Sequence, residues 1–355
     1  MRRSRVARPV LALLLLLLAF GRADDIMCVA GHQLPELFVL GAQKCSTSSF
    51  GQQLTESFGL RYGGAKETHC FDMGGCPSLN SFAGRFPPCG QHTVTLDATP
   101  NYVLPYDADA ALSEIHRLYG PKRLARTTFV MLLCDPVQRA QSFFYQFRPG
   151  NSFRAMAHNL HGDIFEGGLY GKEADKVLDK LGSLVVIPAE AYWRHGAQCI
   201  AELLAIVSRR SGKELSLPAG GGAGEPPRVN ARSHPQLKQD LDSSSFSTLS
   251  RFYRSSIQHI YDLVASGRVV LVPSSLPDDV PLHWLETSAV LSPEQHTTNA
   301  DGARENRGTV AATAKTALPP PAPSDQEGMD RERDQVAPAL APALAPALDP
   351  SPTQP

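Results

Sequence analysis

Short apolar runs alternate along the chain with stretches of helical periodicity, and this alternation restricts the fold more than any other feature. The apolar runs lie at residues 36–40, 93–96, 127–133, 183–187 and 268–272, and the helical stretches at 48–57, 108–118, 137–147, 198–207 and 244–265. Strands that alternate with helices favour an α/β fold with a central, mainly parallel sheet flanked by helices. We expect it to form a single domain over residues 34–275. Ligands bind such sheets at the carboxyl ends of the strands, so functional residues should directly follow the apolar runs.

The two ends of the chain differ in composition from this domain. Residues 1–8 are rich in arginine and precede an almost pure Leu/Ala run, as in a secretory signal. The run is shorter than the roughly 20 residues that a membrane-spanning helix requires. We therefore expect residues 1–23 to be a cleaved signal peptide, with a short membrane anchor as the alternative. Residues 293–355 are rich in Pro and Ala and offer little to bury, which predicts a disordered tail.

The charge balance disfavours broad binding to polyanions. The whole chain has 34 basic and 35 acidic residues, and the predicted signal removes five arginines and no acidic residue. The remaining chain is therefore acidic, and an anionic ligand must be held by a local pocket. No basic stripe interleaved with aromatic residues points to nucleic acid as a partner.

All seven cysteines lie beyond the predicted signal. In the oxidising lumen that a signal peptide implies, we expect some of them to pair. Cys70, Cys76 and Cys89 lie in a Gly/Pro-rich stretch without periodicity, where a disulfide would compensate for a missing core. The odd number leaves at least one free thiol or an intermolecular bridge. The spacings match no zinc-ligand pattern, so no metal is expected.

The first chemical motif is the loop after the first apolar run, Gly-Ala-Gln-Lys-Cys-Ser-Thr-Ser at residues 41–48. The first N–H groups of a helix and the positive end of its dipole bind phosphate or sulfate. Lys44 adds a full charge to this loop. The hydroxyl groups of Ser46, Thr47 and Ser48 add further donors. No second glycine precedes the lysine, so this is not the nucleoside-triphosphate loop. The alternative is an ordinary helix start without a ligand.

The second motif follows the apolar run at 127–133 and reads Cys-Asp-Pro-Val-Gln-Arg-Ala-Gln-Ser at residues 134–142. Pro136 suits the first turn of a helix, where its missing N–H group would have no partner. Arg139 and Ser142 are three residues apart and share a helical face, so they can contact one phosphate together. The alternative leaves both on an ordinary helix surface.

The combination of motifs resembles the sulfotransferase superfamily, and specifically its glycosaminoglycan or heparan-sulfate type of carbohydrate sulfotransferase. Members pair G-x-x-K-x-G-T-[ST] with a later R-D-P-x-x-R-x-x-S, and carry K-E-x-H-F-F and E-K-[ST]-P-x-Y between them. The corresponding segments here are residues 41–48, 66–71, 97–102 and 134–142, in the same order and with the same spacing. The resemblance covers roughly residues 34–264 and implies a P-loop-like sulfotransferase fold.

The resemblance also implies a donor, 3′-phosphoadenosine 5′-phosphosulfate (PAPS), and residues that hold it. These are Lys44, Cys45, Ser46, Thr47 and Ser48 for the 5′-phosphosulfate, and Arg139 and Ser142 for the 3′-phosphate. Lys44 would neutralise charge as the bridging oxygen leaves. Glu67 resembles the general base that removes the proton of the acceptor hydroxyl.

On the acceptor side, the resemblance implies a hydroxyl or amine of a carbohydrate or glycoconjugate. The residues that it places there are Lys66, His69, Asp97 and Tyr102. Lys66 would steer an anionic acceptor. Such an enzyme would act in the Golgi lumen or at the Golgi membrane, with secretion as the alternative.

Three departures from the family pattern bear on activity. Cys134 stands where the family has the arginine before Asp-Pro, and Ala98 where it has the lysine before Thr-Pro. Ser46 replaces the second glycine of the loop, which is a milder change. Two lost cations weaken the binding of a polyanionic donor. The alternative function is therefore a binding protein that keeps the sulfotransferase fold with impaired catalysis. A kinase-like phosphotransferase is disfavoured by the position of the lysine in the loop and by the lack of an evident metal-binding carboxylate after an apolar run.

Overall fold

The structure is a computed structural model that describes residues 26–72, 76–90, 93–147, 152–157, 160–215, 226–227 and 242–275. The predicted signal peptide and the predicted tail lie outside these residues. Within them, no helix combines the length and the apolar character that crossing a membrane requires.

A six-stranded sheet forms the centre of the fold, with the strand order β4-β5-β3-β6-β7-β8 and every neighbouring pair parallel. Its strands are β3 (Leu37–Gly41), β4 (Arg61–Tyr62), β5 (Thr95–Asp97), β6 (Thr128–Leu133), β7 (Val185–Pro188) and β8 (Val270–Leu271). The strands β3, β6 and β7 are buried along their whole length. Both faces of these strands are covered, which explains why they read as continuous apolar runs.

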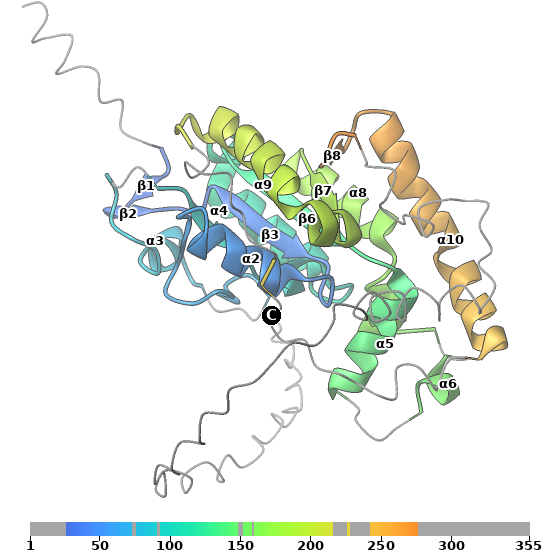
Figure 1. Cartoon of the computed structure of the whole chain (residues 1–355). Coiled ribbons are helices and arrows are strands. Elements are labelled where there is room, and N and C mark those ends of the chain that lie inside the picture. The colour runs from blue at the N-terminus through green and yellow to red at the C-terminus, as the bar shows by residue number, and fades with distance from the viewer. Residues whose placement is uncertain are drawn as a thin grey trace, which may run out of the picture. The chain divides into compact units, whose positions relative to one another are not determined.

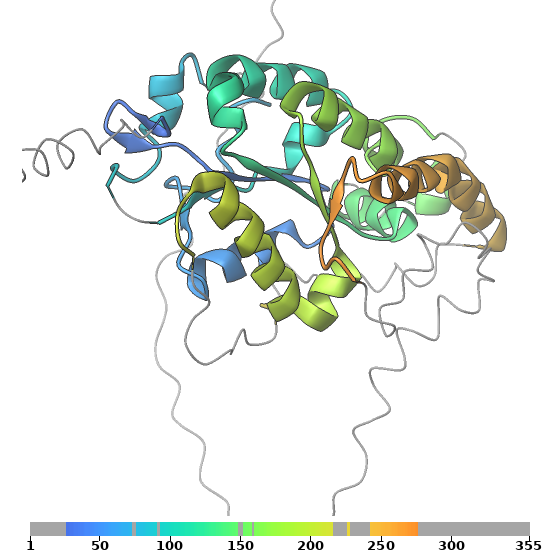
Figure 2. The same cartoon turned by 90° about the horizontal axis from the view of Figure 1, so that it is seen from above.

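Helices cover both faces of this sheet, with α2 and α9 on one face and α4 and α8 on the other (Figures 1 and 2). The longer helices are α2 (Thr47–Glu56), α4 (Ala108–Leu124), α5 (Pro136–Phe147), α8 (Tyr170–Leu181), α9 (Ala189–Ser211) and α10 (Ser243–Ala265). The shorter ones are α3 (Leu79–Ala83), η1 (Pro100–Val103), α6 (Phe153–Met156) and α7 (Asp163–Glu166). The α/β fold with a parallel, helix-flanked sheet, predicted from the sequence, is confirmed.

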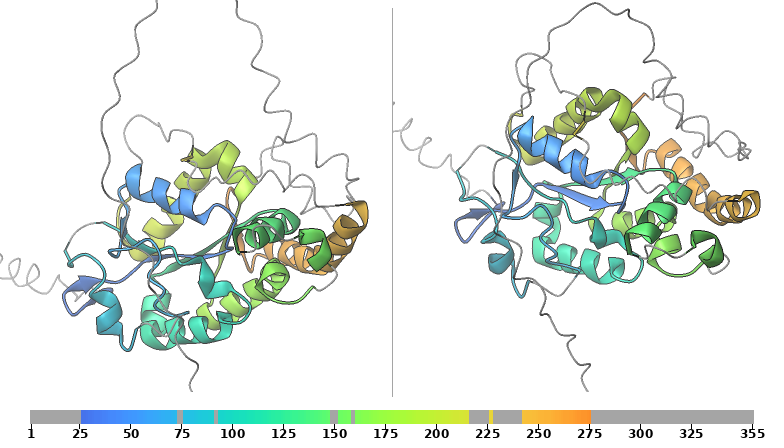
Figure 3. Two further views of the ribbon diagram at one scale, coloured as in Figure 1. Left: turned by 90° about the horizontal axis from the view of Figure 1, so that it is seen from below. Right: turned by 60° about the horizontal axis from the view of Figure 1, so that its bottom comes forward.

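A second, smaller core lies beside the sheet, where α5, α6 and α10 come together (Figure 3). Aromatic residues from these helices and from α7 dominate it, including Phe144, Phe153, Phe165, Phe246 and Tyr253. The Tyr253 hydroxyl donates a hydrogen bond to the Phe165 backbone oxygen at 3.0 Å. This cluster supports α5, the helix that carries the second motif.

Several elements were not predicted from the sequence. The helix α8 buries residues at helical spacing, Tyr170, Ala174, Val177 and Leu181, so its signal was present in the chain. The helix α3 lies in the Gly/Pro-rich stretch and is too short to show a period; its side-chain cap is the Ser78 hydroxyl. A two-stranded antiparallel hairpin, β1 (Cys28–Val29) and β2 (His32–Gln33), is shorter still.

The main core is organised around Phe38 in β3, which is 1% exposed. Its ring lies within 6.4 Å, centroid to centroid, of five other aromatic rings: Phe71, Phe82, Tyr102, Tyr119 and Phe129. All five rings belong to segments that follow β3 along the chain. Phe38 therefore joins β3 to those segments.

We expect Phe38→Ala to lower the free energy of unfolding by about 3–5 kcal/mol, because it leaves a cavity among these rings. Phe147→Ala, at a side chain that is 57% exposed, is the matched control and should change it by less than about 1 kcal/mol. Denaturant titration measures both. Equal effects of the two substitutions would contradict this description of the core.

Candidate functional site

The candidate site lies at the carboxyl ends of β3, β5 and β6, which are neighbours in the sheet. The loop after β3 places Lys44 and Ser46 in left-handed backbone conformations, with φ values of 75° and 67°. Two hydrogen bonds hold the ends of this loop: Ala42 N–H to the Leu132 oxygen at 2.8 Å, and Trp193 Nε1–H to Ser46 Oγ at 2.9 Å. Directly after it α2 begins, and the first N–H groups of a helix have no partner within the helix.

A disulfide between Cys45 and Cys134 joins this loop to the end of β6, with Cα atoms 5.4 Å apart. Tyr170 packs against the bridge: its hydroxyl donates to the Cys134 oxygen at 2.9 Å and lies 3.5 Å from Cys45 Sγ. In the sequence, Cys45 belongs to the first motif and Cys134 stands where the family has an arginine. Their pairing was not predicted, because the connectivity of cysteines cannot be deduced from spacing alone.

Arg139 is 1% exposed and serves as a clamp between segments of the backbone. Its guanidinium donates to the backbone oxygens of Gln43 at 3.2 Å, Asp163 at 2.8 Å and Ile164 at 2.9 Å. It also lies 5.0 Å from the centroid of the Phe143 ring. Burial lowers the pKa of Arg139. The structure thus places Arg139 behind the loop after β3, which it supports through the Gln43 oxygen.

Ser142 and Lys44 lie on the elements that follow two neighbouring strands, β6 and β3. Ser142 is half-buried in α5. Lys44 Nζ donates to Gln146 Oε1, one turn further along α5, at 2.5 Å. The structure therefore brings the two sequence motifs together at one edge of the sheet.

Four charged residues form a connected chain beside α2. Lys66 Nζ donates to Ser48 Oγ at 2.9 Å and pairs with Glu67. Glu67 Oε2 lies 3.2 Å from His69 Nε2, and His69 Nδ1 lies 2.7 Å from Asp72 Oδ2. Burial lowers the pKa of His69, but the hydrogen bond and charge of Asp72, together with Glu67, outweigh it and raise the pKa above 6.5. Asp72, a carboxylate three residues after a histidine, was not among the residues predicted from the sequence.

Asp97 and Tyr102 lie in the core beneath this chain, both 0% exposed. Asp97 accepts hydrogen bonds from the hydroxyls of Thr68 and Thr99, each at 2.6 Å, and from Tyr102 at 2.9 Å. Burial raises the pKa of both Asp97 and Tyr102. Because Thr68 lies between Glu67 and His69, this network positions the two residues above it.

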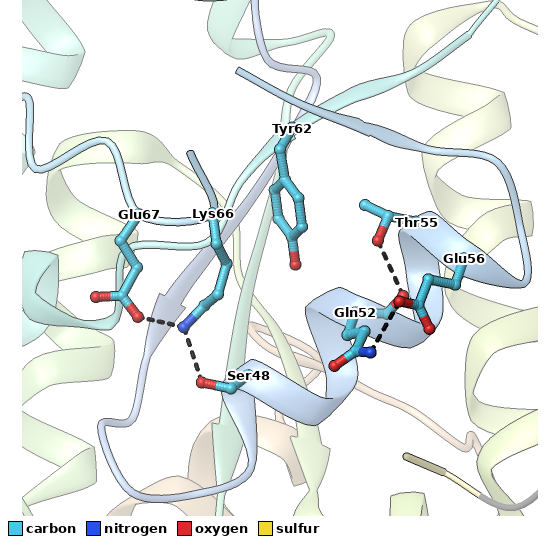
Figure 4. A pocket seen from close by; sticks show the side chains of 7 residues that line it. All are labelled: Ser48, Gln52, Thr55, Glu56, Tyr62, Lys66 and Glu67. Atoms are coloured by element: carbon cyan, nitrogen blue, oxygen red, sulfur yellow. Dashed lines mark hydrogen bonds and ion pairs between the residues drawn. The ribbon is translucent and has the colours of Figure 1, made fainter. Parts of the chain in front are cut away.

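An open cavity of about 590 Å³ adjoins the site on the side of Glu67. Figure 4 shows its lining: Ser48, Gln52, Thr55 and Glu56 from α2, and Tyr62, Lys66 and Glu67 from β4 and the segment after it. Lys66 lies between Ser48, at the start of α2, and Glu67. A volume of this size suits a small organic group.

Two further disulfides, Cys28–Cys89 and Cys70–Cys76, confirm that the Gly/Pro-rich stretch is cross-linked. Among the described residues Cys199 is free, and burial raises the pKa of its thiol to about 12. Three disulfides fit an oxidising compartment of the secretory pathway.

Comparisons with known proteins agree with this fold. A solved sulfotransferase from Alicyclobacillus acidocaldarius is similar to the chain, with a TM-score of 0.50 and 18% sequence identity. The match covers 65% of this chain and 96% of that one. No family model and no curated protein matches the sequence. The chain therefore has a sulfotransferase fold.

The Cys45–Cys134 disulfide leads to a prediction about ligand affinity. Adenosine 3′,5′-bisphosphate is the desulfated form of the donor that the resemblance implies. Replacing both cysteines with serine frees the loop, so we expect this nucleotide to bind about tenfold more weakly in calorimetric titration. Replacing Cys28 and Cys89 with serine is the matched control. The Cys28–Cys89 bridge spans 61 residues and the Cys45–Cys134 bridge spans 89, so the two constrain the unfolded chain similarly. The control should lose stability and keep its affinity. Equal affinity losses would show that the loop bridge has no special role.

The raised pKa of His69 leads to a prediction about pH. Protonated His69 is stabilised by Glu67 and Asp72, so its contribution to stability is complete below pH 6.5 and is lost as the pH rises through the raised pKa. The melting temperature of the wild type should therefore fall more steeply than that of His69→Asn between about pH 6 and pH 8. Parallel melting curves for the two proteins would contradict this assignment.

Proposed function

We propose that this chain is an enzyme that transfers the sulfuryl group from PAPS to a hydroxyl or amine of a carbohydrate or glycoconjugate in the secretory pathway. The observation that carries the proposal is the convergence of two groups at one sheet edge. One is the Lys44 loop at the start of α2, and the other is the Lys66-Glu67-His69-Asp72 chain. The first suits an anionic donor, and the second suits removal of a proton.

In this proposal the Lys44 loop holds the 5′-phosphosulfate of the donor. Lys44 and the N-terminus of α2 supply positive charge, and Ser46, Thr47 and Ser48 supply hydroxyl groups. Ser142 on α5 contacts the 3′-phosphate. Arg139 acts through the loop backbone with its Nε and Nη1, which donate to backbone oxygens. Its buried Nη2 has no hydrogen-bond partner among the described residues.

The reaction is an in-line displacement at sulfur. The acceptor oxygen forms a bond to sulfur while the bond from sulfur to the bridging oxygen breaks, and its electron pair moves to the 5′-phosphate. Lys44 stabilises the charge that gathers there. A Glu67 carboxylate oxygen takes the acceptor proton. His69, held by Asp72 at 2.7 Å, orients Glu67 through its other ring nitrogen.

A second candidate function is a binding protein with the same fold and impaired catalysis. It is favoured by Cys134, which is engaged in a disulfide where the family has an arginine, and by Ala98, which is 0% exposed. Both positions lack the cation that the family pattern carries there. The two candidates differ in whether the chain binds and turns over the donor nucleotide.

Sulfate transfer from labelled PAPS onto a panel of glycans tests the enzymatic proposal. Lys44→Ala should lower both donor affinity and turnover, because this charge acts on the donor and in the transition state. Glu67→Gln should lower turnover by about 100-fold or more with donor affinity unchanged, since it keeps the shape and loses the base.

Lys172→Ala, at an exposed lysine of α8, is the control and should retain full transfer. Loss of donor affinity in Glu67→Gln equal to that in Lys44→Ala would make Glu67 a structural residue. Absence of transfer by the wild type to every glycan would favour the binding protein.

A further inference from the structure

The cavity beside Glu67 provides information about the acceptor, given the proposed function on which this inference rests. Its wall includes the proposed base and continues away from the Lys44 loop along one face of α2. Ser48, Gln52, Thr55 and Glu56 fall on that face, because residues four, seven and eight positions after Ser48 lie near it on a helix. A group in this cavity would lie next to Glu67.

The charge of this wall is negative. Glu56 and Glu67 are carboxylates, and Lys66 is the cation among the seven lining residues. Lys66 is already paired with Glu67 and hydrogen-bonded to Ser48. The positive charge of Lys66 is therefore largely compensated by Glu67. The negative charge of Glu56 then remains as the charge of the wall. An anionic donor in the adjoining loop would make the surroundings of the acceptor more negative still.

Glu56 is held at the cavity. Its side chain is exposed, and Gln52 Nε2 donates to Glu56 Oε1 at 2.8 Å. Figure 4 shows both residues on the side of the cavity opposite Glu67. The remaining lining groups are uncharged and can form hydrogen bonds: the amide of Gln52, the hydroxyls of Ser48 and Thr55, and the phenol of Tyr62. Burial, followed by the charges of Glu67 and Glu56, raises the pKa of Tyr62, which keeps the phenol neutral.

We infer that this cavity is the acceptor site and that it selects an uncharged, hydroxyl-rich saccharide, with Glu56 acting against polyanionic chains. The resemblance to the glycosaminoglycan branch predicts the opposite, an anionic acceptor steered by Lys66. The pairing of Lys66 with Glu67 and the carboxylate at position 56 favour the neutral sugar.

Two oligosaccharides of equal length test this inference. Chitohexaose is uncharged, whereas a hyaluronan hexasaccharide carries a carboxylate on every second sugar. Binding of each is measured by calorimetry at low salt, with and without saturating adenosine 3′,5′-bisphosphate. We expect the wild type to bind chitohexaose about three- to tenfold more tightly than the hyaluronan fragment, the range expected for like-charge repulsion near a protein surface.

Glu56→Lys should remove this preference, and Glu56→Gln should reduce it. Asp179→Lys is the matched control: it changes the net charge equally at an exposed position of α8 and should leave the preference unchanged. Glu56 is in the last turn of α2, where a cation is favoured over a carboxylate, so we expect the lysine variant to fold.

The inference is overturned if the wild type binds neither saccharide or binds the hyaluronan fragment at least as tightly. Equal preferences in Glu56→Lys and Asp179→Lys would also overturn it. Failure of the nucleotide to bind overturns the proposed function instead, and the measurements without nucleotide still decide the preference of the cavity. If the nucleotide binds and the hyaluronan fragment binds more tightly than chitohexaose, only the neutral acceptor is refuted. The proposal of sulfuryl transfer is then retained.

Discussion

The parallel pairing of β3 with β6 is the constraint on which the rest of the site depends. Two adjacent parallel strands end at the same edge of a sheet, so the loop after β3 and the segment after β6, which includes α5, must meet. Three contacts then join them: the Cys45–Cys134 disulfide, the hydrogen bond from Arg139 to the Gln43 oxygen, and the one from Lys44 to Gln146. All three contacts follow from the two strands ending side by side at this edge.

These contacts change how the site would hold an anion. At the position where the family pattern has an arginine, the chain has a covalent bridge, which restricts the loop without adding charge. Arg139 likewise contributes through the loop backbone. Binding would thus depend on a rigid loop, the N-terminus of α2 and Lys44, because less positive charge is available. The Asp97 network plays a similar part for Glu67 and His69, since it fixes Thr68 between them.

The sequence was sufficient to predict the sheet, because buried parallel strands are continuous apolar runs, and to predict which loops meet. It was insufficient to predict the role of a residue wherever that role depends on three-dimensional contacts. The resemblance implies that Arg139 contacts the ligand, and the structure adds hydrogen bonds from its guanidinium to backbone oxygens, which have no sequence signal. Cys134 was interpreted as a loss, because nothing in the spacing pairs it with Cys45. Asp97 was assigned to the acceptor, whereas the structure places it in the core under three hydroxyl groups.

Thermal-shift titration of the wild-type chain with adenosine 3′,5′-bisphosphate tests the central claim most directly, because a ligand that binds only the folded state raises its melting temperature. At a concentration 100 times the dissociation constant the stabilisation is about 2.7 kcal/mol, which corresponds to a rise of roughly 5–10 °C for a domain of this size. Our account predicts such a rise in the wild type and its loss in Lys44→Ala. An unchanged melting temperature at millimolar nucleotide would contradict the sulfotransferase assignment and leave the fold as a scaffold for another ligand.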